Sequence, residues 1–287
     1  MNRRTFLHSS AALFAVNTAW GQSQALTARQ IVERIQKNVG VPWRTQTVDT
    51  FKTGNPDTPV KGIATTMMAT FDVLQRASAA GRNMVITHEP TFYSGDDDTK
   101  ALVNDPTYLA KQAFVEKNSM VVWRFHDHWH ARTPDGIMAG MMAALGWEKY
   151  RNPENQRQIV VPTTTLGNLA KEIQDRLKIR SMRVIGDPSW PVSRVAMNPG
   201  YASLMGSLRS IANPEVDVYI VGEAREWEGY EYAQDTIAAG KKKGFIALGH
   251  VVSEEGGMEE CARWLKTFVT EVPIEFIRAG EPFWSPK

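Results

Sequence analysis

Five histidines of this 287-residue chain follow segments that the sequence predicts to be buried strands. They are His88, His126, His128, His130 and His250. In open α/β sheets the carboxyl ends of parallel strands form the edge where ligands bind. Imidazoles that gather at one such edge indicate a metal site. The alternative is a solvent-facing histidine patch that responds to pH.

Carboxylates accompany these histidines. Glu89 directly follows His88, and Glu254 comes four residues after His250. A mixture of imidazole and carboxylate ligands suits zinc, iron or manganese, and several carboxylates favour a site for two such ions. The sequence therefore predicts a centre of two divalent transition-metal ions.

The stretch from residue 126 to residue 130 reads His-Asp-His-Trp-His. Alternate residues of an extended segment face the same side, so we expect His126, His128 and His130 to point in one direction. Trp129 could stack on a substrate, although such a tryptophan is more often packed in a core.

Other chemistry is excluded by the sequence. It contains no Gly-x-Ser-x-Gly elbow, no Walker A loop and no Gly-x-Gly-x-x-Gly motif. The single cysteine, Cys261, excludes an intramolecular disulfide and a Cys-x-x-Cys site. The chain has 33 basic and 31 acidic residues, so its charge is nearly balanced. This balance argues against a nucleic-acid partner.

The elements that must position these residues alternate between strand and helix. We predict strands at 60–65, 84–86, 120–123, 159–161, 182–185, 192–197, 218–221, 245–248 and 274–277. We predict helices at 27–39, 69–80, 105–117, 133–146, 166–177, 227–239 and 257–269. This order predicts an α/β protein, a layered α/β sandwich in two halves with largely parallel or mixed sheets and helices on their faces.

The mature chain divides at polar and proline-rich stretches. We expect an N-terminal α/β half at 27–150 that carries two metal-ligand blocks, a middle α/β segment at 151–215, and a C-terminal α/β segment at 216–287. The last segment would return a Gly-His-x-x-Ser-Glu block to the site.

Residues 1–21 are typical of a secretory signal. Arg3 and Arg4 precede a weakly apolar run at 11–16, and small residues stand before a cleavage point at residue 22. The arginine pair resembles a twin-arginine leader, which predicts a folded protein exported to the periplasm or secreted. The run is too short to cross a bilayer of about 30 Å, so we expect no stable membrane anchor. The alternative is an amphipathic first helix that is retained.

Three blocks of this sequence together resemble the Nif-three-like family (NGG-one-interacting factor three), also called dinuclear metal centre proteins. The blocks are Ile86-Thr87-His88-Glu89-Pro90, then His126 with His130 before Asp135-Gly136, and Gly222-Glu223 with Gly249-His250-Val251-Val252-Ser253-Glu254. Two positions depart from the family pattern. Glu89 stands where the family has a second histidine, and His130 where it has an aspartate. The two exchanges keep the number of ligands and their formal charge.

The resemblance implies a ligand set, an activity and an assembly. The implied ligands are His88, Glu89, His130, His250 and Glu254, and His126 or His128 could join them. The implied activity is hydrolysis of an unknown small molecule by a metal-activated water, with Glu254 taking part in catalysis. The implied assembly is a homo-oligomer.

Two acids after Gly222 have open roles. Glu223 and Glu226 could orient ligands, and Glu226 is our candidate for a catalytic base. Alternatively, both complement the dipole of the helix that follows.

Two other functions are alternatives to the hydrolase. One is a non-enzymatic metal-binding or regulatory protein on the same scaffold, and the other is an oligomeric scaffold protein with a vestigial site.

Overall fold

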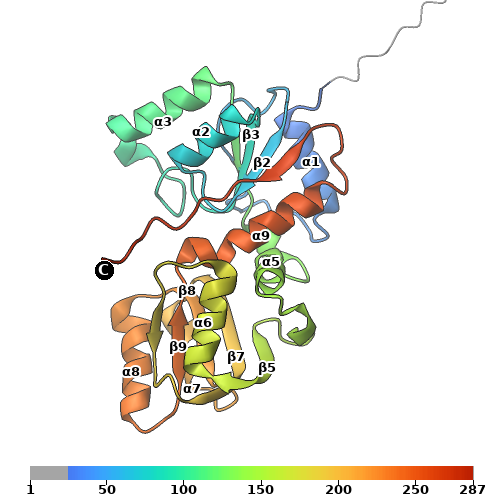
Figure 1. Ribbon diagram of the computed structural model, residues 1–287. Coiled ribbons are helices and arrows are strands. Elements are labelled where there is room, and N and C mark those ends of the chain that lie inside the picture. The colour runs from blue at the N-terminus through green and yellow to red at the C-terminus, as the bar shows by residue number, and fades with distance from the viewer. Residues whose placement is uncertain (1–24, 287) are drawn as a thin grey trace, which may run out of the picture.

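The computed structural model describes residues 25–286, which form two five-stranded sheets with helices around them (Figure 1). The fold class predicted from the sequence, an α/β protein in two halves, is confirmed. The predicted leader at 1–21 lies outside the described residues. Among the helices of residues 25–286, none combines the length and apolar character that crossing a membrane requires.

The first sheet has the strand order β1-β4-β3-β2-β10. Strands β2 (Ile63–Thr66), β3 (Met84–Thr87), β4 (Val121–Arg124) and β10 (Ile274–Phe276) run parallel, and β1 (Phe51–Thr53) is antiparallel to β4. Every residue of β2, β3 and β4 is buried, as expected for strands that are covered on both faces. The short edge strand β1 was not predicted.

Helices cover both faces of this sheet, and successive side chains of each strand point to opposite faces. Helix α1 (Ala28–Asn38) packs on the face that holds Ile63, Met84 and Trp123. Helices α2 (Phe71–Ala79) and α3 (Pro106–Lys117) pack on the opposite face. Thr27 caps α1, and its side chain forms a capping box with Gln30.

The second sheet has the strand order β5-β7-β8-β9-β6. Strands β7 (Pro191–Tyr201), β8 (Val218–Glu223) and β9 (Gly244–Ala247) are parallel, whereas the edge strands β5 (Gln158–Thr165) and β6 (Arg183–Ile185) are antiparallel to their neighbours. Helix α6 (Leu166–Leu177) covers one face, and α7 (Leu204–Ala212) with α8 (Glu231–Ala238) covers the other (Figure 1). Short helical turns complete the chain: η1 (Lys100–Leu102), η2 (Glu148–Tyr150) and the π-type turn η3 (Glu226–Tyr230).

Two helices, α5 (Gly136–Leu145) and α9 (His250–Leu265), lie between the sheets (Figure 1). They cross very closely, because a Cβ atom on Gly140 would lie 2.1 Å from the carbonyl oxygen of Gly256. The prediction that the last helix begins at Gly257 is wrong, since α9 begins at His250. Gly256 and Gly257 do not break the helix; they let it approach α5.

The sheets divide the chain less simply than the predicted segments. The boundary expected at residue 151 falls between the strands of the two sheets. The boundary expected at residue 216 falls inside the second sheet, between β7 and β8. After α9 the chain returns to the first sheet as β10. Helix α9 therefore leads the chain from β9 of the second sheet back to β10 of the first sheet.

Candidate metal centre

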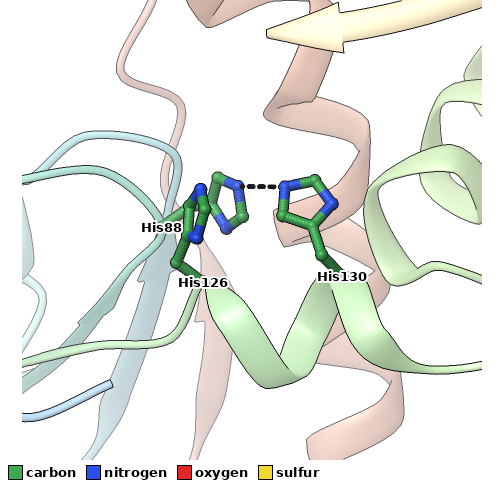
Figure 2. Close-up of side chains that lie close together, drawn as sticks. All are labelled: His88, His126 and His130. Carbon is green, nitrogen blue, oxygen red and sulfur yellow. Dashed lines mark hydrogen bonds between the residues drawn. The ribbon is translucent and has the colours of Figure 1, made fainter. Parts of the chain in front are cut away.

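Histidines from the ends of β3 and β4 converge between the two halves of the molecule. Figure 2 shows His88, His126 and His130 with their rings turned toward one another. The Nε2 atoms of His88 and His130 are 3.2 Å apart, and the ring centroids of His88 and His126 are 4.6 Å apart. Ligand atoms of these three side chains all lie within 4.8 Å of one another, which suits a shared cation.

Carboxylates and a fourth histidine complete this cluster. His88, Glu89 and Glu254 also offer ligand atoms within 4.8 Å of one another. Nε2 of His250 lies 3.2 Å from Glu89 Oε1 and 3.3 Å from Glu254 Oε2. The structure therefore brings together all six residues predicted as metal ligands. They are His88, Glu89, His126, His130, His250 and Glu254.

A short helix that the sequence did not predict positions two of the histidines. After β4 the chain enters α4 (Asp127–Ala131), with His126 at its N-cap and His130 one turn later. Asp49 holds the start of this helix, because its Oδ1 accepts hydrogen bonds from the amides of His126 at 2.6 Å and Asp127 at 2.9 Å. The expectation that alternate residues 126, 128 and 130 point one way is wrong, since helical geometry aligns residues four apart.

His128 is turned away from the cluster and has a structural role. Its Nδ1 lies 2.6 Å from Asp49 Oδ2, and its Nε2 accepts a hydrogen bond of 2.9 Å from the backbone amide of Arg44. Its ring stacks on Trp43 with 3.7 Å between centroids. Because both ring nitrogens have partners, His128 has no lone pair to offer a metal. Trp129 is also fully buried and donates to the carbonyl of Gly257, so it is packed.

The four histidines of the cluster share one orientation. Each Nδ1 faces a hydrogen-bond acceptor outside the cluster, at 2.9 to 3.1 Å. The pairs are His88 with the Phe125 carbonyl, His126 with Asp127, His130 with Asp135, and His250 with Glu223. A proton held on Nδ1 leaves the Nε2 lone pair free, and Nε2 is the atom that faces into the cluster. This is the arrangement that metal-binding histidines adopt.

Electrostatics differ from one histidine to the next. Burial, together with the charges of His130 and His126, holds the pKa of His88 well below its usual value, so the His88 ring is neutral. Burial also lowers the pKa of His250, but Glu223, Glu254 and Glu89 outweigh it and raise that pKa to about 12. The carboxylates therefore create a place that favours positive charge.

One carboxylate oxygen in the cluster forms no hydrogen bond and faces only the ring nitrogens of His250 and His88, at 3.3 and 3.6 Å. Glu254 is only 2% exposed, and its Oε2 accepts no hydrogen bond from any residue between 25 and 286. Gly200 makes room for this carboxylate, because a Cβ atom there would lie 2.4 Å from Glu254 Oε1. A buried oxygen without a partner is costly unless a cation or a donor meets it. The residues of the cluster thus fit a bound metal.

The two acids after Gly222 have different surroundings. Glu223 reaches His250, with 3.0 Å between Oε1 and Nδ1, which is the ligand-orienting contact considered for it. Glu226 is not brought to the cluster; its side chain is 75% exposed and pairs with Arg183 at 2.8 Å.

Three supporting residues were not identified from the sequence. Arg124 donates to Glu89 Oε2 at 3.0 Å and also pairs with Asp97, so it fixes the direction of Glu89. Asp135 and Asp49 each bind both a histidine ring and the amides at a helix start. An arginine at the end of an apolar strand, and aspartates placed as helix caps, are the only sequence signals they give.

Comparison with known sequences identifies a matching family. The sequence model of the family Duf34/NIF3 (NGG1p interacting factor 3) matches residues 26–282. A protein of Chlamydia pneumoniae named GTP cyclohydrolase 1 type 2 homolog is 26% identical over 249 residues, which cover 80% of this chain and 88% of that protein. A protein of the same name from Clostridium acetobutylicum is 24% identical over 63% of this chain and 68% of its own.

Solved structures show the same fold. The Bacillus cereus protein related to NIF3 superposes with a TM-score of 0.72 at 14% identity, covering 92% of this chain and 100% of that one. Staphylococcus aureus protein SA1388 superposes with a TM-score of 0.70 at 16% identity, covering 91% of this chain and 99% of that one.

Proposed function

This chain belongs to the Duf34/NIF3 family, and from that premise we propose that it binds two divalent transition-metal ions, zinc, iron or manganese, and hydrolyses a small molecule. The observation that carries the proposal is the shared orientation of four imidazoles, which turn Nε2 into the cluster. Nε2 of His88, His130 and His250 lies within 4.0 Å of Glu254, and Nε2 of His126 lies 4.0 Å from Glu89. We further propose, from Arg3 and Arg4, that the protein is exported to the periplasm or secreted.

Six side chains would hold the ions, namely His88, Glu89, His126, His130, His250 and Glu254. When bound, divalent ions supply Lewis acidity and lower the pKa of coordinated water. The chain's own groups do the positioning. Asp135 and Glu223 hold protons on Nδ1 of His130 and His250, and Arg124 keeps Glu89 directed into the cluster. Glu254 faces the cluster with a free oxygen and is the carboxylate placed to accept a proton.

The exposure of the ligands favours a reactive centre over a purely structural one. His88 and Glu254 form a buried floor, whereas the side chains of His126, His130 and His250 are 25 to 29% exposed. Structural metal sites are closed by protein ligands, and catalytic sites stay open to substrate. A non-enzymatic metal-binding protein and a scaffold with a vestigial site are the outcomes that the following experiment would distinguish.

The test is metal content, measured by plasma mass spectrometry on natively purified full-length protein. We expect about two equivalents of transition metal in the wild type and a large loss in Glu254→Gln and His250→Ala. The matched control is Glu259→Gln, which alters an exposed carboxylate on the same helix as Glu254.

Activity separates the remaining readings. Metal-loaded protein would be screened against phosphoesters, cyclic amides and GTP, the last because the name of two relatives mentions a GTP cyclohydrolase. Hydrolysis that is lost with the metal supports the enzyme. Metal binding without turnover of any of these substrates favours a binding protein. A metal-free wild type that takes up no Zn²⁺, Mn²⁺ or Fe²⁺ would support the alternative of a scaffold protein with a vestigial site.

A further inference from the structure

A cavity of about 420 Å³ lies on the second sheet, between α7 and the part of the sheet where the edge strand β5 pairs with β7. Its walls come from the start of β5, from the carboxyl-terminal part of β7, from the polar face of α7 and from Tyr219 of β8. Cavities of this size can enclose a small ligand.

The charge of this cavity is one-sided. Arg157 and Arg209 line it, and no aspartate or glutamate does. Most arginines of residues 25–286 form ion pairs, for example Arg124 and Arg194. Arg157 and Arg209 pair with no carboxylate in that part of the chain. Two unpaired guanidinium groups in one cavity create a site that attracts an anion.

Neutral hydrogen-bonding groups accompany the two arginines. Asn198 accepts a hydrogen bond from Arg157, which holds one side of the guanidinium and leaves its other N–H groups free. Ser203, Ser210 and Tyr219 bring hydroxyl groups to the lining. Arginine with hydroxyl donors is the combination that recognises a phosphate or carboxylate group.

Two segments of the chain link the lining of this cavity to residues that support the metal centre. Gln156, the residue before Arg157, accepts a hydrogen bond of 2.9 Å from the backbone amide of Asp135, and Asp135 holds His130. On the β7 side, Asn198 precedes by two residues the Gly200 that makes room for Glu254. The segments that carry Arg157 and Asn198 therefore also contact residues that support His130 and Glu254.

We propose that this cavity binds the anionic group, a phosphate or a carboxylate, of the small molecule on which the metal centre acts. The assignment of that molecule as a substrate rests on the proposed hydrolase function, whereas anion binding by the cavity does not. The proposal narrows the substrate to an anionic metabolite whose charged group binds between Arg157 and Arg209.

The probe is inorganic phosphate, titrated by calorimetry into full-length protein from which metal has been removed with a chelator. We expect measurable binding, weakened ~10-fold in Arg157→Gln and in Arg209→Gln, since each removes a charge-assisted hydrogen bond. Arg151→Gln is the matched control, because Arg151 is exposed, lies near the start of β5 and does not line the cavity. Parallel titration with acetate decides whether phosphate or carboxylate is preferred.

Two results would overturn the proposal. One is the absence of phosphate binding to metal-free protein. The other is binding that both cavity variants leave unchanged. Phosphate that binds only after metal loading, and is lost in Glu254→Gln, would place the anion on the metals and leave the proposed hydrolase standing. Phosphate binding that depends on Arg157 and Arg209 in a protein that takes up no metal would keep the cavity and remove the hydrolase.

Discussion

At the scale of single residues, the candidate centre depends on partners that never face the metal position. Each of the four imidazoles has one acceptor at Nδ1, and three of these four acceptors are carboxylates: Asp127, Asp135 and Glu223. Such partners fix the ring and raise its basicity as a ligand. Glu89 and His130, the two residues that differ from the family pattern, are also held by such partners. Arg124 orients Glu89, and Asp135 orients His130.

Substitution of Asp135 separates its two functions. Its Oδ2 binds His130, and its Oδ1 caps α5 by accepting from the amides of Ile137 and Met138. Asp135→Asn keeps a capping oxygen, so we expect metal affinity to fall ~10- to 100-fold with little change in stability. Asp135→Ala should also cost about 1 kcal/mol through the lost cap. Zinc titration and urea unfolding measure the two effects, and wild-type zinc affinity in Asp135→Asn would contradict the prediction.

A buried lysine makes stability depend on alkaline pH. Lys111 is 2% exposed and donates to the carbonyl of Thr91 at 2.6 Å, in the loop that follows Glu89. Burial lowers its pKa from 10.5 to about 8. Between these values the unfolded chain binds a proton that the folded chain does not, so stability rises with pH there, by up to about 3 kcal/mol.

Removing that amine should flatten this part of the stability profile. We expect Lys111→Met to be more stable than the wild type near pH 7 and to show a smaller rise from pH 8 to 10.5. Denaturant unfolding at several pH values checks this. Lys117→Met, at an exposed position of the same helix, serves as the control. Equal slopes for Lys111→Met and the wild type would show that the amine does not titrate in this range.

At the scale of elements, the ends of secondary structure decide which side chains meet. Strand β3 delivers His88 and Glu89, β4 leads into α4, and β9 leads through Gly249 into α9. Helix α9 then places His250 and Glu254 one turn apart on the same face. The close approach of α5 to α9 sets where this helix lies.

The crossing of α5 and α9 tolerates no side chain at Gly140. A Cβ atom there would lie 2.1 to 2.4 Å from backbone atoms of Gly256 and Gly257. Because these are backbone atoms, a side-chain rotation cannot relieve the clash. We expect Gly140→Ala to lower stability by about 3 kcal/mol and to reduce metal content by displacing α9. Thermal unfolding and metal analysis test this against Gly95→Ala, where a Cβ atom meets nothing within 4 Å. Unfolding of Gly140→Ala at the same temperature as Gly95→Ala would count against the crossing.

At the scale of the whole molecule, the ligands come from two distant parts of the chain. The first sheet supplies His88, Glu89, His126 and His130, and α9 supplies the other two after the chain has built the second sheet. A cation held by the six proposed ligands would join these parts. Ligand that binds only the folded state stabilises it by mass action.

Metal should therefore raise the unfolding temperature of the entire protein. At a Zn²⁺ concentration 100 times the dissociation constant we expect about 2.7 kcal/mol of added stability, seen as an increase in Tm that a chelator reverses. Glu254→Gln should lose most of this increase and Glu259→Gln should keep it. An equal increase in wild type and Glu254→Gln would show that zinc acts elsewhere.

The sequence alone determined the fold class and the ligand types. Apolar runs that alternate with amphipathic segments predict strands covered by helices. The histidines follow predicted strands, and because strand ends form the ligand-binding edge, this position indicates a site. Hydrophobic periodicity and the position of a histidine after a strand depend only on residues close together in the sequence. They can therefore be recognised from a single sequence.

The tertiary structure decided which of these residues share a site. His128 has the same residue type and nearly the same position as His126 and His130, yet α4 and Asp49 turn it away from them. Gly256 and Gly257 look like a helix end, but packing against α5 keeps them inside α9. Glu226 stays at the surface while Glu223, three residues earlier, reaches His250. In each case a residue far away in the chain sets the outcome, and spacing within one segment carries no record of that partner.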